Sequence, residues 1–501
     1  MDSNPNLGMR SRLHSYAKTI FAIDLRSLGA FRIVLGLFLL IDLALRARFF
    51  CFFLTDAGPF PRDAIPYVPS FRFLFFLSGD APVQMFLYAV MVLAAIMFTV
   101  GYKTRVATVI LWFCIAAHHA RCPMALSGED RLPLQFLIWS IFLPMGAKYS
   151  VDSWRRPIGA NSSPNPYLSL ASAAILLQFI AMYLITGLTK SGDAWVDGSA
   201  IWRSLGSDYW VMPLGRLFRE SYGLTVVMTY VVPAFEWLLA LTLLIPFHRN
   251  RIRAVTIVLL FLFQVGLLFS IELRMFPLMS NVGLILFVPP AWWEKFHSSA
   301  VRRNLEYETR ATAADSGRRW RSAAIVRDAV VASLMIFSGV LALQCLSKYR
   351  SLPLVPRSSA PAILAGQIGL NQSWPMYSPN PDSHEYKVKL VGIQEGTAGI
   401  DILAETVSPS WEKVKRFHEA YRFQYYLERM FHKRKEYPRL MEAYLDWICR
   451  EWHEAVDSGM NIDRVRYFLE IRDMRPVERQ PRRLMLVAEH ACRWTGEEDS
   501  R

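Results

Sequence analysis

The chain has 501 residues, of which 53% are hydrophobic and 20% charged, and its formal net charge at pH 7 is +14. Its apolar residues come in long blocks, which excludes an ordinary water-soluble globular protein. The basic residues gather at the ends of these blocks, so the charge favours a lipid bilayer as partner and argues against nucleic acid.

Nine apolar blocks are candidates for membrane helices, since a bilayer core of about 30 Å needs about 20 apolar residues. They cover approximately residues 28–53, 83–100, 106–118, 132–145, 168–188, 224–246, 254–270, 277–288 and 329–346. The third, fourth and eighth are short and could be tilted, re-entrant or buried helices. We therefore expect a mainly α fold, with residues 28–346 as a polytopic membrane helix bundle of about eight to nine spans.

Charge asymmetry orients these spans. Residues 1–27 are polar and basic without the apolar core of a signal peptide, so we expect a cytoplasmic N-terminal segment. Further Lys and Arg residues fall in every second loop, which places those loops in the cytoplasm. The opposite, exoplasmic face then receives residues 55–82, 119–131, 190–223 and 272–276, together with everything after the ninth span.

The sequence after the eighth block changes character. Residues 294–327 are polar and strongly basic, as expected for a partly helical, solvent-facing cytoplasmic linker inside the membrane domain. Residues 351–501 predict a small exoplasmic α+β domain, opened by a Pro/Ser-rich connector at 351–361 and a loop at 371–381. Alternation predicts strands at 385–393, 400–404, 465–471 and 482–488, and helical periodicity covers 411–458.

The six cysteines show no spacing typical of a metal site, so we expect no metal. Cys51, Cys114 and Cys345 lie in or beside apolar blocks, and Cys122 lies in a short loop. Cys449 and Cys492 are the pair in the C-terminal domain. They could form a disulfide in an exoplasmic domain, or remain two buried thiols.

Two acidic residues, Asp42 and Glu236, fall inside apolar blocks, where an unpaired charge costs several kcal/mol. Each could pair with a cation and fix helix packing. Pro233 loosens the helix just before Glu236, which would also suit a carboxylate that lines a cavity and relays a proton or holds a substrate.

A polar cluster follows the third block. His119 and Arg121, with Glu129 and Asp130 further on, could hold an anionic substrate or tune a proton transfer. They could equally be interfacial ion pairs and helix caps, with Asp130 as the N-cap of a helix that starts at Leu132.

Lys190 lies two residues past the fifth block and opens the segment 190–198. A lysine at the end of a span can be a membrane anchor whose amine reaches water. If it is partly buried instead, with Trp195 and Val196 as an apolar wall, its neutral amine could abstract a proton.

The segment Thr186–Gly198 resembles the lysine-containing signature of the vitamin-K-dependent gamma-carboxylase family, which includes the bacterial HTTM (horizontally transferred transmembrane domain) proteins. Further stretches resemble the family in the same order along the chain: 31–36 with Asp42 and 55–58, 101–105, 119–123, 143–152, 275–277 and 371–379. The resemblance covers most of residues 31–290 and indicates a bacterial-type member, located in the inner membrane.

This resemblance implies a reaction. In the animal enzymes a lysine at the position of Lys190 deprotonates vitamin K hydroquinone, whose oxygenation drives carboxylation of a glutamate side chain on the lumenal face. It therefore implies a reduced membrane quinone as cofactor, no metal, and a secreted or membrane peptide as substrate. The candidate catalytic residues are Lys190, as base, with Glu129, Asp130 and His119, and the candidate substrate-binding residues are Arg121, Trp195 and Glu236.

The sequence also departs from the family pattern. Gly128 and Glu129 align with an Asn-His pair that supports the lysine in the animal enzymes, and an acid there would favour protonated lysine. Gln264 stands where many bacterial relatives have histidine, and the C-terminal domain is short. A quinol- or lipid-linked enzyme with another substrate therefore stays an alternative, as does an HTTM protein without carboxylase activity that binds a peptide or lipid or helps to export it. The sequence gives no oligomeric state.

Overall fold

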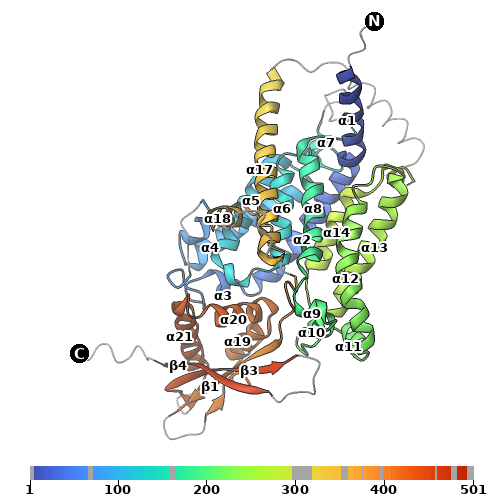
Figure 1. Ribbon diagram of the computed structural model, residues 1–501. Coiled ribbons are helices and arrows are strands. Elements are labelled where there is room, and N and C mark those ends of the chain that lie inside the picture. The colour runs from blue at the N-terminus through green and yellow to red at the C-terminus, as the bar shows by residue number, and fades with distance from the viewer. Residues whose placement is uncertain are drawn as a thin grey trace. The chain divides into compact units, whose positions relative to one another are not determined.

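The structure is a computed structural model, and it describes residues 5–65, 71–156, 165–295, 319–350, 359–374, 376–394, 399–405, 407–456, 460–474 and 482–492 (Figure 1). Most of the expected linker at 294–327 lies outside the described residues. The chain forms two compact units. The first unit comprises Met1–Asp42, Met91–Ala116 and Gly128–Pro381, and the second unit comprises Leu43–Val90, Ala117–Ser127 and Asp382–Arg501.

Six helices of the described residues are long and apolar enough to cross a membrane. They are α2 (Leu25–Ala47), α4 (Ala81–Val100), α8 (Leu170–Thr189), α12 (Tyr222–Thr242), α13 (Arg249–Ser270) and α17 (Arg319–Arg350). The three short blocks are helical too, as α5 (Thr104–Arg121), α6 (Gly128–Ser140) and α14 (Phe276–Leu284). The predicted fold class, a mainly α multi-pass membrane protein, is therefore confirmed.

Shorter helices connect these elements. They are α1 (Pro5–Phe21), α3 (Phe50–Leu54), α7 (Val151–Trp154), α9 (Asp193–Val196), α10 (Ala200–Ser204), α11 (Pro213–Arg219), α15 (Pro290–Lys295), α18 (Ser359–Ile368) and the 3-10 turns Leu74–Phe76, Pro123–Ala125 and Ile285–Phe287. The sequence did not predict α18, because its Pro361 suggested a connector. Proline is tolerated in the first turn of a helix, where its missing N–H has no intrahelical partner to lose.

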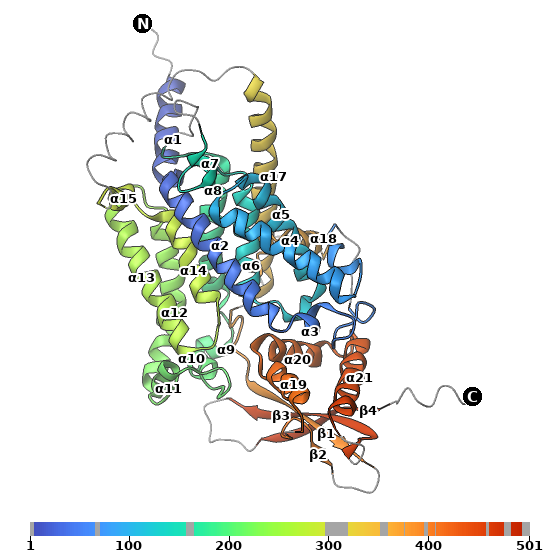
Figure 2. The same ribbon diagram turned by 180° about the vertical axis from the view of Figure 1, so that it is seen from behind.

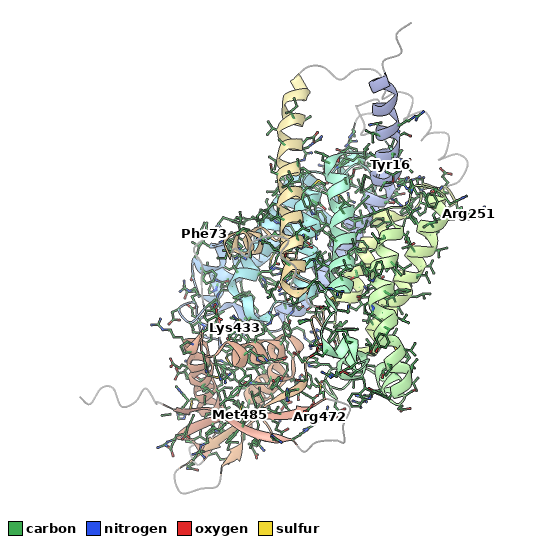
Figure 3. All side chains as sticks on the ribbon, viewed as in Figure 1. Tyr16, Phe73, Arg251, Lys433, Arg472 and Met485 are labelled. Carbon is green, nitrogen blue, oxygen red and sulfur yellow. A yellow bond between two sulfur atoms is a disulfide. The ribbon has the colours of Figure 1, made fainter. Side chains whose placement is uncertain are left out.

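Helix α8 is the most buried of the six candidate spans and packs against α6, α12 and α17. It begins at a capping box in which the side chains of Ser169 and Ser172 each bond the other residue's backbone N–H. Helices α12 and α13 instead expose large apolar side chains such as Val231 and Phe261, as expected for helices that face lipid. Figure 3 shows Tyr16 of α1 and Arg251 of α13 towards one end of the first unit.

A buried arginine on α2 organises one end of the first unit. Arg32 is fully buried and donates to the carbonyls of Met145 (3.1 Å) and Tyr149. Gly101, at φ +73°, lies directly against this guanidinium. A Cβ at Gly101 would lie 2.3 Å from Arg32 Nη1 and 2.4 Å from Ser150 Cβ. Only glycine combines this backbone conformation with this close approach.

Gly101→Ala is therefore expected to destabilise the first unit by about 2 kcal/mol or more, since it adds both a clash and left-handed strain. The measurement is the apparent melting temperature of the detergent-purified protein. Gly266→Ala is the matched control, because Gly266 is helical and a Cβ there would meet nothing within 4 Å. Equal melting temperatures for the two variants would contradict this account.

The second unit carries a four-stranded antiparallel sheet in the order β2-β1-β3-β4, which consists of β1 (His384–Ile393), β2 (Ile400–Asp401), β3 (Arg464–Asp473) and β4 (Arg483–Ala491). Three amphipathic helices, α19 (Pro409–Glu419), α20 (Tyr421–Lys433) and α21 (Pro438–Ala455), cover one of its faces (Figure 2). The four predicted strands and the predicted helical stretch are confirmed, and the stretch is divided at Ala420 and Tyr437. The core between helices and sheet contains the buried Trp411, Trp447 and Trp452.

A disulfide joins Cys449 of α21 to Cys492, which follows β4, with a Cα–Cα distance of 5.5 Å. Of the two possibilities that the sequence left open, the structure contains the disulfide. It connects the helical layer to an edge strand of the sheet.

His418 of α19 is buried as a neutral imidazole. Its Nδ1 lies 2.7 Å from the carbonyl of Val414 and its Nε2 lies 2.8 Å from the hydroxyl of Tyr444. A ring that carries its proton on Nδ1 donates to the carbonyl and accepts from the hydroxyl. Burial lowers the pKa of His418 from 6.5 to about 4.

This lowered pKa makes the stability of the second unit depend on pH. Between pH 6.5 and about 4 the unfolded chain binds a proton that the folded chain does not. The free energy of unfolding therefore decreases as the pH is lowered through that window, by about 3 kcal/mol in total. His418→Gln should flatten this dependence, as measured by hydrogen exchange of peptides from α19 to α21. His453→Gln, at an exposed position of α21, should leave it unchanged. Identical pH profiles for His418→Gln and wild type would contradict the assignment.

Candidate functional site

Lys190 is buried inside the first unit, at the C-terminal end of α8. The residue is 7% exposed, and its amine donates to a carboxylate oxygen of Glu236 on α12. The same nitrogen lies 3.5 Å from the carbonyl of Thr186 and 5.5 Å from the centre of the Trp195 ring. The amine is therefore held by a carboxylate and covered by an indole, whereas the amine of a membrane anchor reaches water.

Close packing of α8 and α12 brings the pair together. A Cβ at Gly187 would lie 2.8 Å from the carbonyl of Pro233 and 3.3 Å from Cβ of Glu236, so only glycine allows this approach. On α12 the buried residues recur on a single face, at Thr225, Thr229, Glu236 and Ala240. Glu236 therefore faces the first unit's interior and forms the ion pair that the sequence left open, with Lys190 as the cation.

Two further polar atoms of α8 and α13 are buried in the first unit. Tyr183, two turns before Lys190 on α8, accepts a hydrogen bond from Gln264 Nε2 of α13 at 2.7 Å. Gln264 Oε1 and Thr186 Oγ1 are buried and have no hydrogen-bond partner within the described residues. A bound ligand or water is one way in which buried polar atoms of this kind can be satisfied.

Residues near position 380 complete the surroundings of Lys190. The indole N–H of Trp195 donates to the carbonyl of Tyr377 at 2.9 Å, and the N–H of Gly192 donates to that of Pro379 at 2.9 Å. Thr189 Oγ1 donates to Ser378 Oγ at 2.9 Å. Position alone did not connect this segment with Lys190, and the signal that could have done so was that both stretches resemble the same family.

Glu129 and Asp130 lie in the first turn of α6, in the first unit. The helix begins at Gly128, so the expectation that Asp130 caps a helix starting at Leu132 is wrong by one turn. Glu129 Oε2 accepts from the N–H of Met275, at 3.0 Å, at the N-terminus of α14. A carboxylate is favourable there, because the N–H groups of a first helical turn lack intrahelical partners. The carboxylate bonded to Lys190 is that of Glu236.

His119 and Arg121 belong to the second unit. Arg121 is fully buried and donates to the carbonyls of Phe60 (2.7 Å) and Leu54 (3.4 Å) and to Asp56 Oδ1 (3.2 Å). These contacts connect the end of α5 to residues 54–60, so Arg121 has a structural role here. His119 is also buried, and its ring centroid lies 6.0 Å from that of His118.

The family model of the HTTM domain matches residues 21–292, which is more than half of the chain. The chain belongs to the HTTM domain family. No curated protein and no solved structure matches the sequence.

All seven candidate residues of the sequence analysis lie within the HTTM domain. Of these seven, Lys190 contacts both Trp195 and Glu236 in the structure. The segment around position 380 lies beyond the matched residues. Among the residues that the structure describes, no group of three or more His, Cys, Asp or Glu side chains could hold a metal ion.

Proposed function

We propose that this HTTM protein is a membrane carboxylase-like enzyme, in which the Lys190–Glu236 pair takes a proton from a reduced membrane quinone. The reaction would couple oxygenation of that quinone to replacement of a glutamate γ proton by carbon dioxide. The observation that carries the proposal is the buried amine of Lys190 at the end of a membrane helix, bonded to a carboxylate in a family that resembles such enzymes.

The hydrogen-bonding capacity of Gln264 Oε1 and Thr186 Oγ1 suits the hydroxyl groups of a quinol. A quinol presents two hydroxyl groups on a flat apolar ring, and Gln264 Oε1 can accept from one hydroxyl while Thr186 Oγ1 can donate or accept. Aromatic residues nearby supply apolar surface: the ring of Phe179 lies 5.3 Å from that of Tyr183 and 5.5 Å from that of Phe287. A quinol held there would supply the reducing electrons for oxygen, giving the quinone epoxide and one water.

The pair itself can serve as the base. Burial disfavours both charges, so the proton shared between Lys190 and Glu236 can lie on either group with a smaller difference in free energy than in water. With the proton on Glu236, the neutral amine of Lys190 can accept a proton from a hydroxyl. The Trp195 ring then stabilises the ammonium that forms, since a cation within about 6 Å of an indole is attracted to it.

The orientation in the membrane is part of the proposal. Alternating basic loops support a cytoplasmic N-terminus and an exoplasmic C-terminal domain in a bacterial inner membrane. The Cys449–Cys492 disulfide supports the same placement, because disulfides persist in oxidising compartments. The glutamate substrate would then belong to a secreted or membrane peptide.

One observation favours a second candidate function. A closed, buried ion pair can simply fix the packing of two helices, as Lys190 and Glu236 do for α8 and α12. The alternative is an HTTM membrane protein without carboxylase activity that modifies, binds or helps to export a peptide or lipid.

The deciding experiment uses the full-length protein in nanodiscs with reduced naphthoquinone, oxygen, labelled bicarbonate and a glutamate peptide. We expect label in carboxyglutamate and formation of the quinone epoxide in step with it. Label that stays at the level of a sample without quinol, in a protein with an intact melting transition, would refute the carboxylase proposal and leave the second candidate.

A further inference from the structure

The segment Tyr377–Asn380, which we call the strap, follows α18 and lies beyond the residues matched to the HTTM domain. Besides the three hydrogen bonds described above, the side-chain oxygen of Asn380 accepts from the N–H of Ala194 at 2.9 Å. These four bonds reach Thr189, Gly192, Ala194 and Trp195, which surround Lys190 in the sequence. The strap therefore holds the backbone on the C-terminal side of the amine and the ring that covers it.

The chain just before the strap is anchored among α6, α8 and α17. Gln372 Nε2 donates to Gln178 Oε1 at 2.6 Å and to Ser338 Oγ at 2.7 Å, and Gln135 Nε2 donates to the carbonyl of Asn371 at 2.7 Å. Gln372, Gln178 and Gln135 are all buried. Amide groups bonded to each other inside a helix bundle are costly to separate, because no water replaces the lost partners.

The strap begins at a strained residue. Tyr377 has φ +60°, an uncommon conformation for a bulky aromatic side chain. Contacts of its backbone and of its side chain maintain this conformation. The carbonyl of Tyr377 accepts a hydrogen bond from the indole N–H of Trp195, and its ring packs against the buried clusters that contain Trp195 and Val211. Strain of this kind persists where surrounding contacts over-determine the backbone, and it concentrates at functional sites.

Asn380 and Gly192 are matched to each other. A Cβ at Gly192 would lie 2.2 Å from Asn380 Oδ1, so the close contact requires glycine on one side and a short acceptor on the other. The bonded N–H of Ala194 lies in the short helix α9, which carries Trp195. Fixing Ala194 therefore also fixes the indole, whose centre lies 5.5 Å from Lys190 Nζ.

We propose that Asn380 is a positioning residue for the amine of Lys190, acting through Ala194 and Trp195, and that the strap is thereby part of the HTTM site. The role as a positioning residue for catalysis rests on the proposed function. The placement of the amine itself does not, and it can be measured without any carboxylation or quinol oxidation.

The test is competitive acetylation of lysines in the full-length protein, with the label on each lysine quantified by mass spectrometry across pH. Lys389, a partly exposed lysine of β1 paired with Asp401, is the internal standard. In Asn380→Ala the acetylation rate of Lys190 relative to Lys389 should rise about fivefold, as expected for the loss of one hydrogen bond that holds the site closed. Asn380→Asp keeps the acceptor oxygen and should stay within about twofold of wild type.

Two further variants complete the design. Asn461→Ala, which removes a partly exposed amide in the second unit, should leave the Lys190 rate unchanged. Ser378→Ala removes the bond to Thr189 and should also raise the rate, so it gives the answer if Asn380→Ala fails to fold. An unchanged Lys190 rate in Asn380→Ala, or an equal rise in Asn380→Asp, would overturn the proposal.

The labelling and the carboxylation assay separate the two proposals. Faster labelling in Asn380→Ala without carboxylation in wild type would refute the proposed function and leave the positioning of the amine in place. Carboxylation in wild type with unchanged labelling in Asn380→Ala would refute the positioning alone. If both proposals hold, Asn380→Ala should lower kcat while the KM for the peptide stays unchanged.

Discussion

Under the proposed function, Lys190→Arg is expected to lower carboxylation by at least about 100-fold while the protein stays folded. Arginine remains protonated at any working pH, so it can keep the ion pair with Glu236 but cannot accept a proton. Loss of a general base typically costs about 100-fold to 10,000-fold in rate. The measurement is incorporation of labelled bicarbonate into the glutamate peptide at saturating quinol.

Lys190→Met is the companion variant, because it removes the amine and the ion pair together. It should be as inactive as Lys190→Arg but less stable, since Glu236 loses its partner. Substantial carboxylation by Lys190→Arg would show that an amine able to lose its proton is not needed at this position. In that case Lys190 serves packing, and the base lies elsewhere.

Glu236→Ala is expected to destabilise the first unit by about 3–5 kcal/mol, which is the usual cost of leaving one member of a buried ion pair alone. The Lys190 side chain is 3% exposed, so its ammonium cannot reach water without displacing the covering residues. The loss should appear as a lower midpoint in denaturant titrations of the detergent-purified protein.

The matched control is the double variant Lys190→Met with Glu236→Leu, which replaces the pair by apolar groups of similar size. It should recover most of the stability lost in Glu236→Ala, because no charge is left buried. A double variant as unstable as the sum of Lys190→Met and Glu236→Leu would show that the two side chains do not interact.

Part of the fold was predictable because its signal is local in the sequence. Apolar blocks of spanning length and alternating strands carry their signal locally, so the helices α2, α8 and α12 and the strands β1 and β3 were predictable. The structure starts α6 at Gly128, one turn before the predicted start at Leu132. Glycine is a poor helix former and gives no signal for a helix start, although Glu129 and Asp130 suit a first turn.

The partner of Lys190 could not be predicted, because it depends on packing between separate helices. Glu236 lies 46 residues further along the chain and reaches the amine because Gly187 lets α12 approach α8. Alignment to a family pattern pointed to Glu129, whose carboxylate instead bonds the N–H of Met275. Asn380 is still more distant, 186 positions along the chain from Ala194, and the sequence offered no local sign of that contact.

The position of the strap in the chain also bears on the order in which the site is made. A ribosome completes α8, α9 and α12 long before it reaches Gln372 and Asn380, which follow the last candidate span, α17. Lys190 and Glu236 are therefore synthesised before the residues that close over them. Because the strap follows α17 in the chain, the contacts of Asn380 with the Lys190 segment can form only after every candidate span has been synthesised.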